Sequence, residues 1–193
     1  MIVLNKKKVI IVLILIVLIL IVLCAAIAVV APPKIIKLIY KKEYSEYVEK
    51  YSEEYGVDKN LVYAVIKAES NFNSDAKSGK DAIGLMQLIK STAQEVTKKA
   101  GLQISNGEME EQLLNPDINI NIGTKYLSYL IDRYKNVEIA VTAYNAGIGT
   151  VDNWIEKGII KADGSDIENV PYKETNNYVR KILRDYKIYS NTY

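Results

Sequence analysis

One uninterrupted run of uncharged, mostly hydrophobic residues dominates the N-terminal part of the chain. It covers residues 9–31, follows three lysines at 6–8 and is stopped by prolines at 32 and 33. As a helix, such a run spans about 30 Å of hydrocarbon, whereas the apolar core of a cleaved signal peptide usually covers about 7 to 15 residues. The pattern predicts a short cytoplasmic tail at 1–8, a transmembrane anchor at 9–31 and a basic linker at 32–43.

Small residues near the end of this run leave cleavage and secretion open as an alternative, because alanines at 25, 26, 28 and 31 suit a signal peptidase. Cys24 follows the bulky Leu23, where a lipoprotein signal has a small residue, so a buried membrane cysteine is the better interpretation. Lysines also follow the run, at 34, 37, 41 and 42. The distribution of positive charge therefore leaves the orientation open.

Beyond the linker, hydrophobic positions recur with the spacing of helices. The clearest stripe consists of Leu61, Val62, Ala64, Val65 and Ala68. Cap residues such as Asp58, Asn115 followed by Pro116, and several glycines mark the ends of the segments. Helices are expected at 44–55, after Asp58, from about 91 (with Thr92 and Glu95 in capping-box spacing) to Gly101, from Asn115 to about 134, at 137–146, at about 151–157 and at about 175–189.

Residues 70–83 interrupt this helical pattern, since they are rich in Asn, Ser, Asp, Gly and Lys, a composition typical of a loop or small hairpin. No segment shows sustained strand alternation or an internal repeat. The fold class expected for residues 44–193 is therefore mostly α, a helical domain with at most a small β-hairpin.

Composition narrows the possible chemistry. The chain has no histidine, which excludes Ser-His-Asp and Cys-His nucleophile systems and removes the commonest ligand of catalytic zinc. Its net charge of +2 arises from 25 basic and 23 acidic residues, so no strong field favours nucleic acid. We expect chemistry that uses carboxylates, hydroxyls, amides or lysines, without a metal or cofactor.

Glu69 is the leading candidate for such chemistry. It lies four residues after Val65, on the buried side of its predicted helix and near the C-terminus of that helix. Burial and the helix dipole both disfavour the charged carboxylate, so both raise its pKa and make it a ready general acid. The alternative is a solvated glutamate, or one paired with Lys67 or Lys77.

The sequence around and beyond Glu69 resembles the lytic transglycosylase domain, over roughly residues 51–183. The resemblance rests on motifs that occur in the family's order: Glu69-Ser70-Asn71-Phe72-Asn73, Ala76, Ser78, Gly84-Leu85-Met86-Gln87-Leu88, Thr92-Ala93, Asn115-Pro116, Asn119-Ile120, Gly123, Tyr126-Leu127, Ala143-Tyr144-Asn145-Ala146-Gly147, Pro171-Tyr172, Glu174-Thr175 and Tyr178-Val179. Lys90 departs from the pattern, because many relatives have a proline at this position. The difference affects only the start of a helix and not the catalytic residues.

The resemblance implies an α+β lysozyme-like fold and cleavage of peptidoglycan glycan strands. Glu69 would protonate the glycosidic oxygen between N-acetylmuramic acid and N-acetylglucosamine. It would then accept the proton of the muramic C6 hydroxyl as a 1,6-anhydro ring closes. Ordinary glycosidases place a second carboxylate about 5 to 10 Å from the first. Asp75 and Asp81 are the nearest acids in sequence, and both are interpreted as solvated loop residues.

The family's other site positions fall on five residues. Ser78 and Gln87 would hold the N-acetyl or neighbouring sugar groups, although turn and helix-entry hydrogen bonds are the alternative. Tyr144 would stand beside the acid, where its hydroxyl holds either the acid or the sugar. Asn145 would shape the turn before Gly147, and the alternative is that it both shapes this turn and contacts the substrate. Glu174 would lie near the cleft, with an ion pair to Arg180 or Lys181 as the alternative.

The hypotheses are therefore a membrane-anchored lytic transglycosylase, a goose-type lysozyme that hydrolyses the same bond with help from aspartates, and a non-catalytic peptidoglycan-binding or assembly module. The first implies glycan strands and the membrane as partners, no nucleic acid, and a monomeric catalytic domain. Since that substrate is extracellular, the expected location is the bacterial cytoplasmic membrane, single-pass, with the catalytic domain outside. A role within growth, division, sporulation or a secretion machine is left open.

Overall fold

A computed structural model describes residues 15–20, 35–102 and 108–193, and the chain divides into two compact units, residues 1–41 with Thr192, and residues 42–191 with Tyr193. In the first unit, residues 15–20 and 35–39 are helical. Within the described part of the chain, no helix combines the length and hydrophobicity that crossing a membrane requires. Most of the span expected at 9–31 lies outside the described residues.

The second unit begins with a pair of helices whose ends follow the sequence signals. Helix α2 covers Ser45–Tyr55 and ends at Gly56, which has a φ of 66° that glycine tolerates without strain. Helix α3 covers Lys59–Glu69, and the side chain of Asp58 accepts a hydrogen bond from the backbone N–H of Asn60. The expected stripe of α3 is buried from Leu61 to Val65, while Ala68 remains partly exposed.

A two-stranded antiparallel hairpin follows, and only its first strand falls within residues 70–83, for which the composition indicated a loop or a small hairpin. Strand β1 covers Ala82–Ile83 and strand β2 covers Leu88–Ile89, with Ala82 opposite Ile89 and Ile83 opposite Leu88. The turn between them is the segment Gly84-Leu85-Met86-Gln87, in which Leu85 and Met86 are fully buried. One side of the hairpin therefore packs into the hydrophobic core.

Two features after the hairpin differ from the expectation. Helix α4 covers Lys90–Ala100 and starts directly from β2, with Ile89 as its N-cap residue and no side-chain cap, so the predicted capping box of Thr92 is wrong. Helix α5, Met109–Leu114, was not predicted, because six residues are too short for a clear hydrophobic period.

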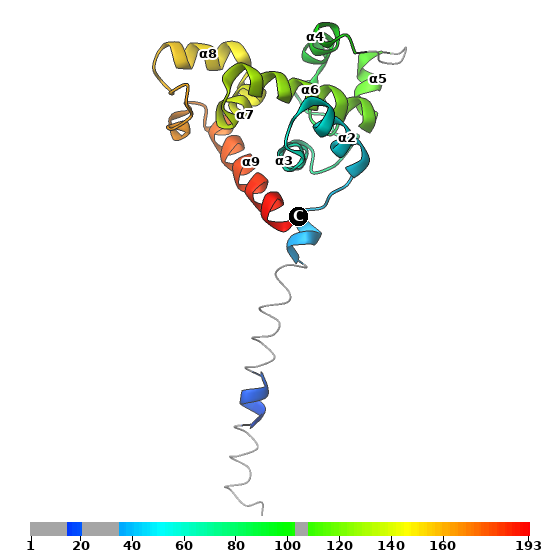
Figure 1. Cartoon of the computed structure of the whole chain (residues 1–193), viewed down its shortest axis with the longest axis vertical. Coiled ribbons are helices and arrows are strands. Elements are labelled where there is room, and N and C mark those ends of the chain that lie inside the picture. Colours follow the sequence, from blue (N-terminus) through cyan, green and yellow to red (C-terminus); the bar gives the residue numbers. More distant parts are fainter. Residues whose placement is uncertain (1–14, 21–34, 103–107) are drawn as a thin grey trace, which may run out of the picture. The chain divides into compact units, whose positions relative to one another are not determined.

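The remaining helices surround a central one. Helix α6, Pro116–Tyr134, packs against α2, α4, α5 and α7. It is followed by α7 at Val137–Ala146, α8 at Ile148–Glu156, a 3-10 turn at Ile167–Asn169 and α9 at Lys173–Thr192. Figure 1 shows α6 between α2 and α7, and α9 running away from α7 toward the C-terminus. The mostly helical fold with one small hairpin is therefore confirmed.

Asn119 of α6 fixes the hairpin to the helices. Its side chain is fully buried, accepts a hydrogen bond from the Met86 N–H at 2.8 Å, and donates to the carbonyl oxygens of Ile83 and Leu113 at 3.0 and 2.8 Å. A Cβ on Gly84 would lie 2.3 Å from the Asn119 amide nitrogen, so only glycine permits this approach. Motifs more than thirty residues apart in the sequence thus form one structural joint.

Candidate active site

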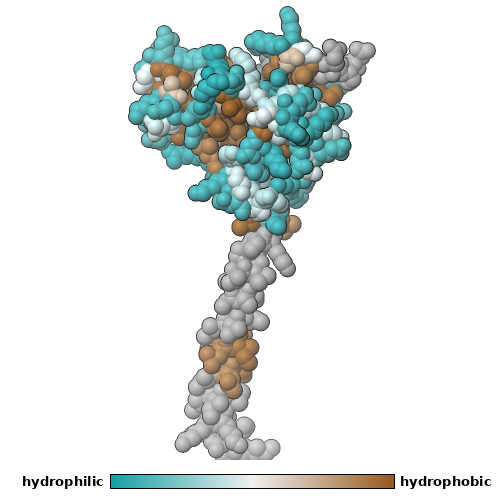
Figure 2. All heavy atoms as spheres, viewed as in Figure 1, coloured by the Kyte–Doolittle hydropathy of each residue, from teal (hydrophilic) through white to brown (hydrophobic). Residues whose placement is uncertain are grey.

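A cleft of about 660 Å³ opens where α3, the hairpin, α7 and α9 meet. It is lined by Glu69, Ser78, Gly79, Lys80, Ala82, Gln87, Ile89, Tyr144, Asn145, Ala146, Tyr172, Glu174 and Thr175. Figure 2 shows one face of the domain, on which a group of hydrophobic residues is bordered by hydrophilic ones. The cleft brings together all six residues that the sequence analysis named as catalytic or substrate-binding.

The carboxyl group of Glu69 stands at the end of α3, facing this cleft. Burial raises its pKa from the ordinary 4.5 to about 7, although a hydrogen bond from Tyr178 and the positive charge of Lys181 both act to lower it. Lys181 donates its own hydrogen bond to the carbonyl oxygen of Ala68 and not to the acid. Near neutral pH, Glu69 therefore exchanges readily between its acid and base forms.

Tyr178 of α9 is the direct partner of this acid. Its hydroxyl donates a 2.5 Å hydrogen bond to Oε1 of Glu69. Burial and the nearby carboxylate raise the pKa of the Tyr178 phenol well above its usual value, so the phenol remains a donor. Tyr178 belongs to the final motif of the sequence but was not predicted as a site residue. The motif itself was the available signal.

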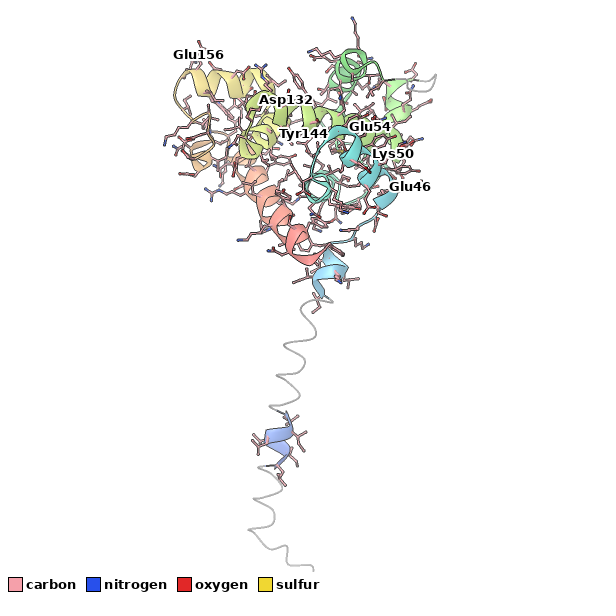
Figure 3. All side chains as sticks on the ribbon, in the orientation of Figure 1. Glu46, Lys50, Glu54, Asp132, Tyr144 and Glu156 are labelled. Atoms are coloured by element: carbon pink, nitrogen blue, oxygen red, sulfur yellow. The ribbon has the colours of Figure 1, made fainter. Side chains whose placement is uncertain are left out.

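Tyr144, near the end of α7, forms a wall of the cleft and does not hold the acid. Its hydroxyl donates to the carbonyl oxygen of Met86 at 2.8 Å, and its ring lies 5.3 Å from that of Tyr126. Figure 3 shows Tyr144 among the helices in the middle of the domain, in contrast to Glu46 and Lys50 on the outer side of α2. Of the two roles expected for the hydroxyl, the bond to the acid belongs to Tyr178.

The side chains of Ser78 and Gln87 both form hydrogen bonds with backbone groups of the cleft wall. The Ser78 hydroxyl oxygen accepts from the N–H groups of Lys80 and Ala82, each at 3.1 Å. The Gln87 amide nitrogen donates to the carbonyl oxygens of Ala76 and Gly84. Each residue keeps a polar group for a ligand, since the Ser78 hydroxyl hydrogen and the Gln87 Oε1 are not used in these bonds.

Asn145 and Glu174 lie where α7 ends and α9 begins. The Thr175 hydroxyl donates to Asn145 Oδ1 at 2.8 Å, which connects the two helices across the cleft floor. Glu174 faces Lys80, with 3.6 Å between Oε2 and Nζ. Glu174 thus lies at the cleft, and the alternative of an ion pair with Arg180 or Lys181 is not favoured, because Arg180 bonds Asn176 and Lys181 bonds Ala68.

Several lysines and acids considered near Glu69 belong to other contacts. Lys67 donates to Asn71, and Lys77 forms an ion pair with Glu110. Asp75 and Asp81 are exposed and do not line the cleft, in agreement with their interpretation as loop residues. Glu69 and Glu174 are thus the carboxylates of the cleft lining, and only Glu69 is held by a buried phenol.

Aromatic and aliphatic surface completes the cleft. Tyr172 is 56% exposed at its edge, and its ring meets Trp154 edge-on at 4.9 Å. Ile89 at the end of β2 is also exposed to the cleft. Neither residue was predicted as a site residue from the sequence. Exposed apolar faces beside hydroxyl and amide groups suit the mixed surface of a sugar.

A second groove, of about 400 Å³, lies beside the first. Its lining includes Thr92 and Val96 of α4, Tyr126 and Tyr129 of α6, and Ile148 of α8. Gly147 also lines it, directly after the cleft residue Ala146, so the two depressions share the α7–α8 turn.

Comparison with known proteins identifies close relatives of this domain. The family model "Transglycosylase SLT domain" matches residues 46–165. The soluble lytic murein transglycosylase of Escherichia coli K12 is 34% identical over 142 residues, covering 72% of this chain and 22% of that protein. Membrane-bound lytic murein transglycosylase C of Serratia proteamaculans is 37% identical over 118 residues, covering 56% of this chain and 32% of that protein.

Solved structures agree with the sequence comparison. The lytic transglycosylase Slt of Pseudomonas aeruginosa, solved as an inactive Glu-to-Gln mutant, superposes with a TM-score of 0.73 at 33% identity, over 80% of this chain and 25% of that one. The 70 kDa soluble lytic transglycosylase of Escherichia coli has the same TM-score at 29% identity, over 81% of this chain and 25% of that one. The chain thus spans about a quarter of the length of these proteins.

Proposed function

The chain belongs to the transglycosylase SLT domain family, and from this premise we propose that it is a membrane-anchored lytic transglycosylase of peptidoglycan. Its substrate is the β-1,4 bond between N-acetylmuramic acid and N-acetylglucosamine, and its product ends in 1,6-anhydro-N-acetylmuramic acid. The observation that carries the proposal is the Glu69 carboxyl group, which faces a sugar-sized cleft with a pKa raised to about 7.

Glu69 performs both proton transfers in this reaction. Protonated Glu69 gives its proton to the glycosidic oxygen as the bond from that oxygen to the muramic anomeric carbon breaks. The resulting carboxylate then takes the proton of the muramic C6 hydroxyl, whose oxygen forms the new bond to the anomeric carbon. Glu69 is protonated again at the end, and no water is consumed. A pKa near the working pH suits both halves of the cycle.

One carboxyl group suffices for this cycle, and the lining of the cleft supports such an arrangement. Glu174, the other carboxylate of the lining, is 79% exposed and lies beside Lys80. It therefore lies in water, whereas the Glu69 carboxyl group is buried. Ser78, Gln87, Tyr144 and Asn145 orient the sugars on either side of the scissile bond through their hydroxyl and amide groups.

A glycan strand is longer than the cleft, and the neighbouring groove accommodates its continuation. Tyr126 and Tyr129 offer aromatic surface there, while Thr92 and the rim residues Glu95 and Lys99 offer polar contacts. The shared turn at Gly147 allows one strand to occupy both depressions. This continuity favours binding within long strands over binding of isolated disaccharides.

The hydrophobic run at residues 9–31 anchors the protein in the cytoplasmic membrane, with the catalytic domain outside. The run is long enough to span a bilayer, and some relatives of the chain are named membrane-bound transglycosylases. The anchoring is tested by carbonate extraction of membranes and by protease accessibility of the domain in intact cells. Recovery of a secreted form that begins after residue 31 would contradict it.

The enzymatic proposal is tested by incubating the full-length protein in detergent with purified sacculi. We expect wild-type protein to release soluble muropeptides, and Glu69→Gln to reduce that release on the order of 10²- to 10⁴-fold while it still binds the sacculi. Glu156→Gln is the matched control, because Glu156 is exposed on α8, away from the cleft (Figure 3). Wild-type protein that binds sacculi and releases nothing would instead indicate a binding or assembly module.

A further inference from the structure

Lys80 is the one lysine or arginine in the lining of the candidate cleft among the described residues. It lies in the tight loop between Ser78 and β1, where the Lys80 N–H donates to the Ser78 hydroxyl and the Asp81 N–H donates to the Ser78 carbonyl oxygen at 3.2 Å. Asp81 has a φ of 58°, which completes the turn. The loop thus fixes the Lys80 backbone at the edge of the cleft while its side chain is 81% exposed.

The ion pair between Lys80 and Glu174 leaves the Lys80 ammonium group available to another anion. The Nζ to Oε2 distance is 3.6 Å, and both side chains are largely in water. Exposed pairs of this kind contribute little to stability, because water and salt screen them and both side chains lose freedom. A carboxylate on a ligand can therefore take the place of Glu174 at low cost.

The charges of the cleft lining determine how well an anionic ligand can bind there. Its lining carries two carboxyl groups, Glu69 and Glu174, against the single ammonium group of Lys80. An anionic ligand would meet repulsion from Glu174 at the cleft edge if Lys80 were absent. Lys80 offsets that repulsion and supplies three N–H donors on a flexible stem.

We infer that Lys80 is a specificity-determining residue that binds a carboxylate of the glycan strand beside the scissile bond. The inference rests on the function proposed above and names which strands the site prefers. Peptidoglycan offers this carboxylate from two sources. A muramic acid without a peptide stem carries a free lactyl carboxylate, whereas a substituted one carries carboxylates only along its stem. Neutral strands lack both.

The test compares three substrates with full-length protein in detergent: strands freed of peptides by an amidase, strands with intact stems, and peptide-free strands whose carboxylates have been converted to methylamides. Lys80→Ala is expected to raise KM about fivefold on the carboxylated strand that Lys80 recognises, with kcat unchanged. Lys80→Arg, which keeps the charge, retains most of the wild-type KM. Lys173→Ala is the matched control, because Lys173 is an exposed lysine next to Glu174 that does not line the cleft.

The outcomes separate the two sources. Dependence on Lys80 with peptide-free strands assigns the lactyl carboxylate, and dependence only with intact stems assigns a stem carboxylate. In either case added salt should raise the wild-type KM more than that of Lys80→Ala, since it screens the contact.

Equal KM values for wild type and Lys80→Ala on both carboxylated strands would overturn the inference. It would also be overturned if Lys80→Ala raised KM on the methylamide strands as much as on the carboxylated strands. The proposed function would survive either result, because cleavage continues. Absence of anhydro products from all three substrates with wild-type protein would instead refute the proposed function, and the inference with it.

Discussion

The phenol of Tyr178 and the carboxyl group of Glu69, 109 residues apart in the sequence, share a 2.5 Å hydrogen bond at the base of the cleft. Helices α3 and α9 each bring one partner of this bond. The bond opposes the effect of burial, because a phenol donor stabilises the carboxylate, while burial stabilises the neutral acid. The balance leaves the pKa of Glu69 at about 7.

Tyr178→Phe is therefore expected to raise the pKa of Glu69, since the mutation removes a donor to the charged form. Because the first step requires protonated Glu69, kcat/KM should decline above the pKa of this acid. In Tyr178→Phe the decline should begin at a higher pH than in wild type, which a pH profile of kcat/KM measures. Tyr186→Phe serves as the control, because Tyr186 on the same helix bonds Asp58. A profile for Tyr178→Phe that is unchanged or shifted to lower pH would contradict the assignment.

Glu69 is also expected to lower the stability of the folded protein at alkaline pH. Its pKa is about 7 when folded and near the ordinary 4.5 when unfolded, so between these values the folded state binds more protons. The free energy of unfolding therefore falls as pH rises through this window. Glu69→Gln carries no such charge and should be about 3 kcal/mol more stable than wild type at pH 8, with the difference vanishing near pH 4.

Urea unfolding at the two pH values measures this effect, and Glu156→Gln provides the exposed comparison. If Glu69→Gln gained no stability over wild type at pH 8, the carboxyl group of Glu69 would have to be well hydrated.

Asn119→Ala is expected to lower the free energy of unfolding by about 2–4 kcal/mol, because it removes three buried hydrogen bonds and leaves the Ile83 and Leu113 carbonyls and the Met86 N–H without that partner. The midpoint of urea unfolding measures the change. Asn153→Ala, at an exposed position of α8, should leave the midpoint within error. A similarly small change in Asn119→Ala would mean that the hairpin is held by packing alone.

Where local signals act, the sequence predicted the helices well. Asn115 caps α6, its side chain accepting from the Asp117 N–H, and Pro116 occupies its first turn. The ends of α7 also agree with the pattern. The predicted start of α8 was three residues late, because Gly147 takes a φ of 85° and the helix begins immediately after it. Helix α4 likewise starts earlier than expected, since β2 leads directly into it.

The composition of the site was predictable from motifs, whereas its pairings were not. Glu69, Ser78, Gln87 and Tyr144 share one cleft as expected. Motifs single out Tyr144 and Tyr178 among the 15 tyrosines, but which of the two reaches the acid depends on how α9 packs beside α3, which the motifs do not show. The partner of Glu174 was missed for the same reason, because Lys80 belongs to a loop almost a hundred residues earlier.

The mass of the fragments that the full-length protein releases from purified peptidoglycan tests the central claim most directly. A single carboxyl group that transfers the proton of the muramic C6 hydroxyl yields 1,6-anhydro ends, so every new muramic end should be lighter by one water than a reducing end. Fragments with reducing ends, formed by uptake of water from the solvent, would contradict the account and indicate a lysozyme-like hydrolase.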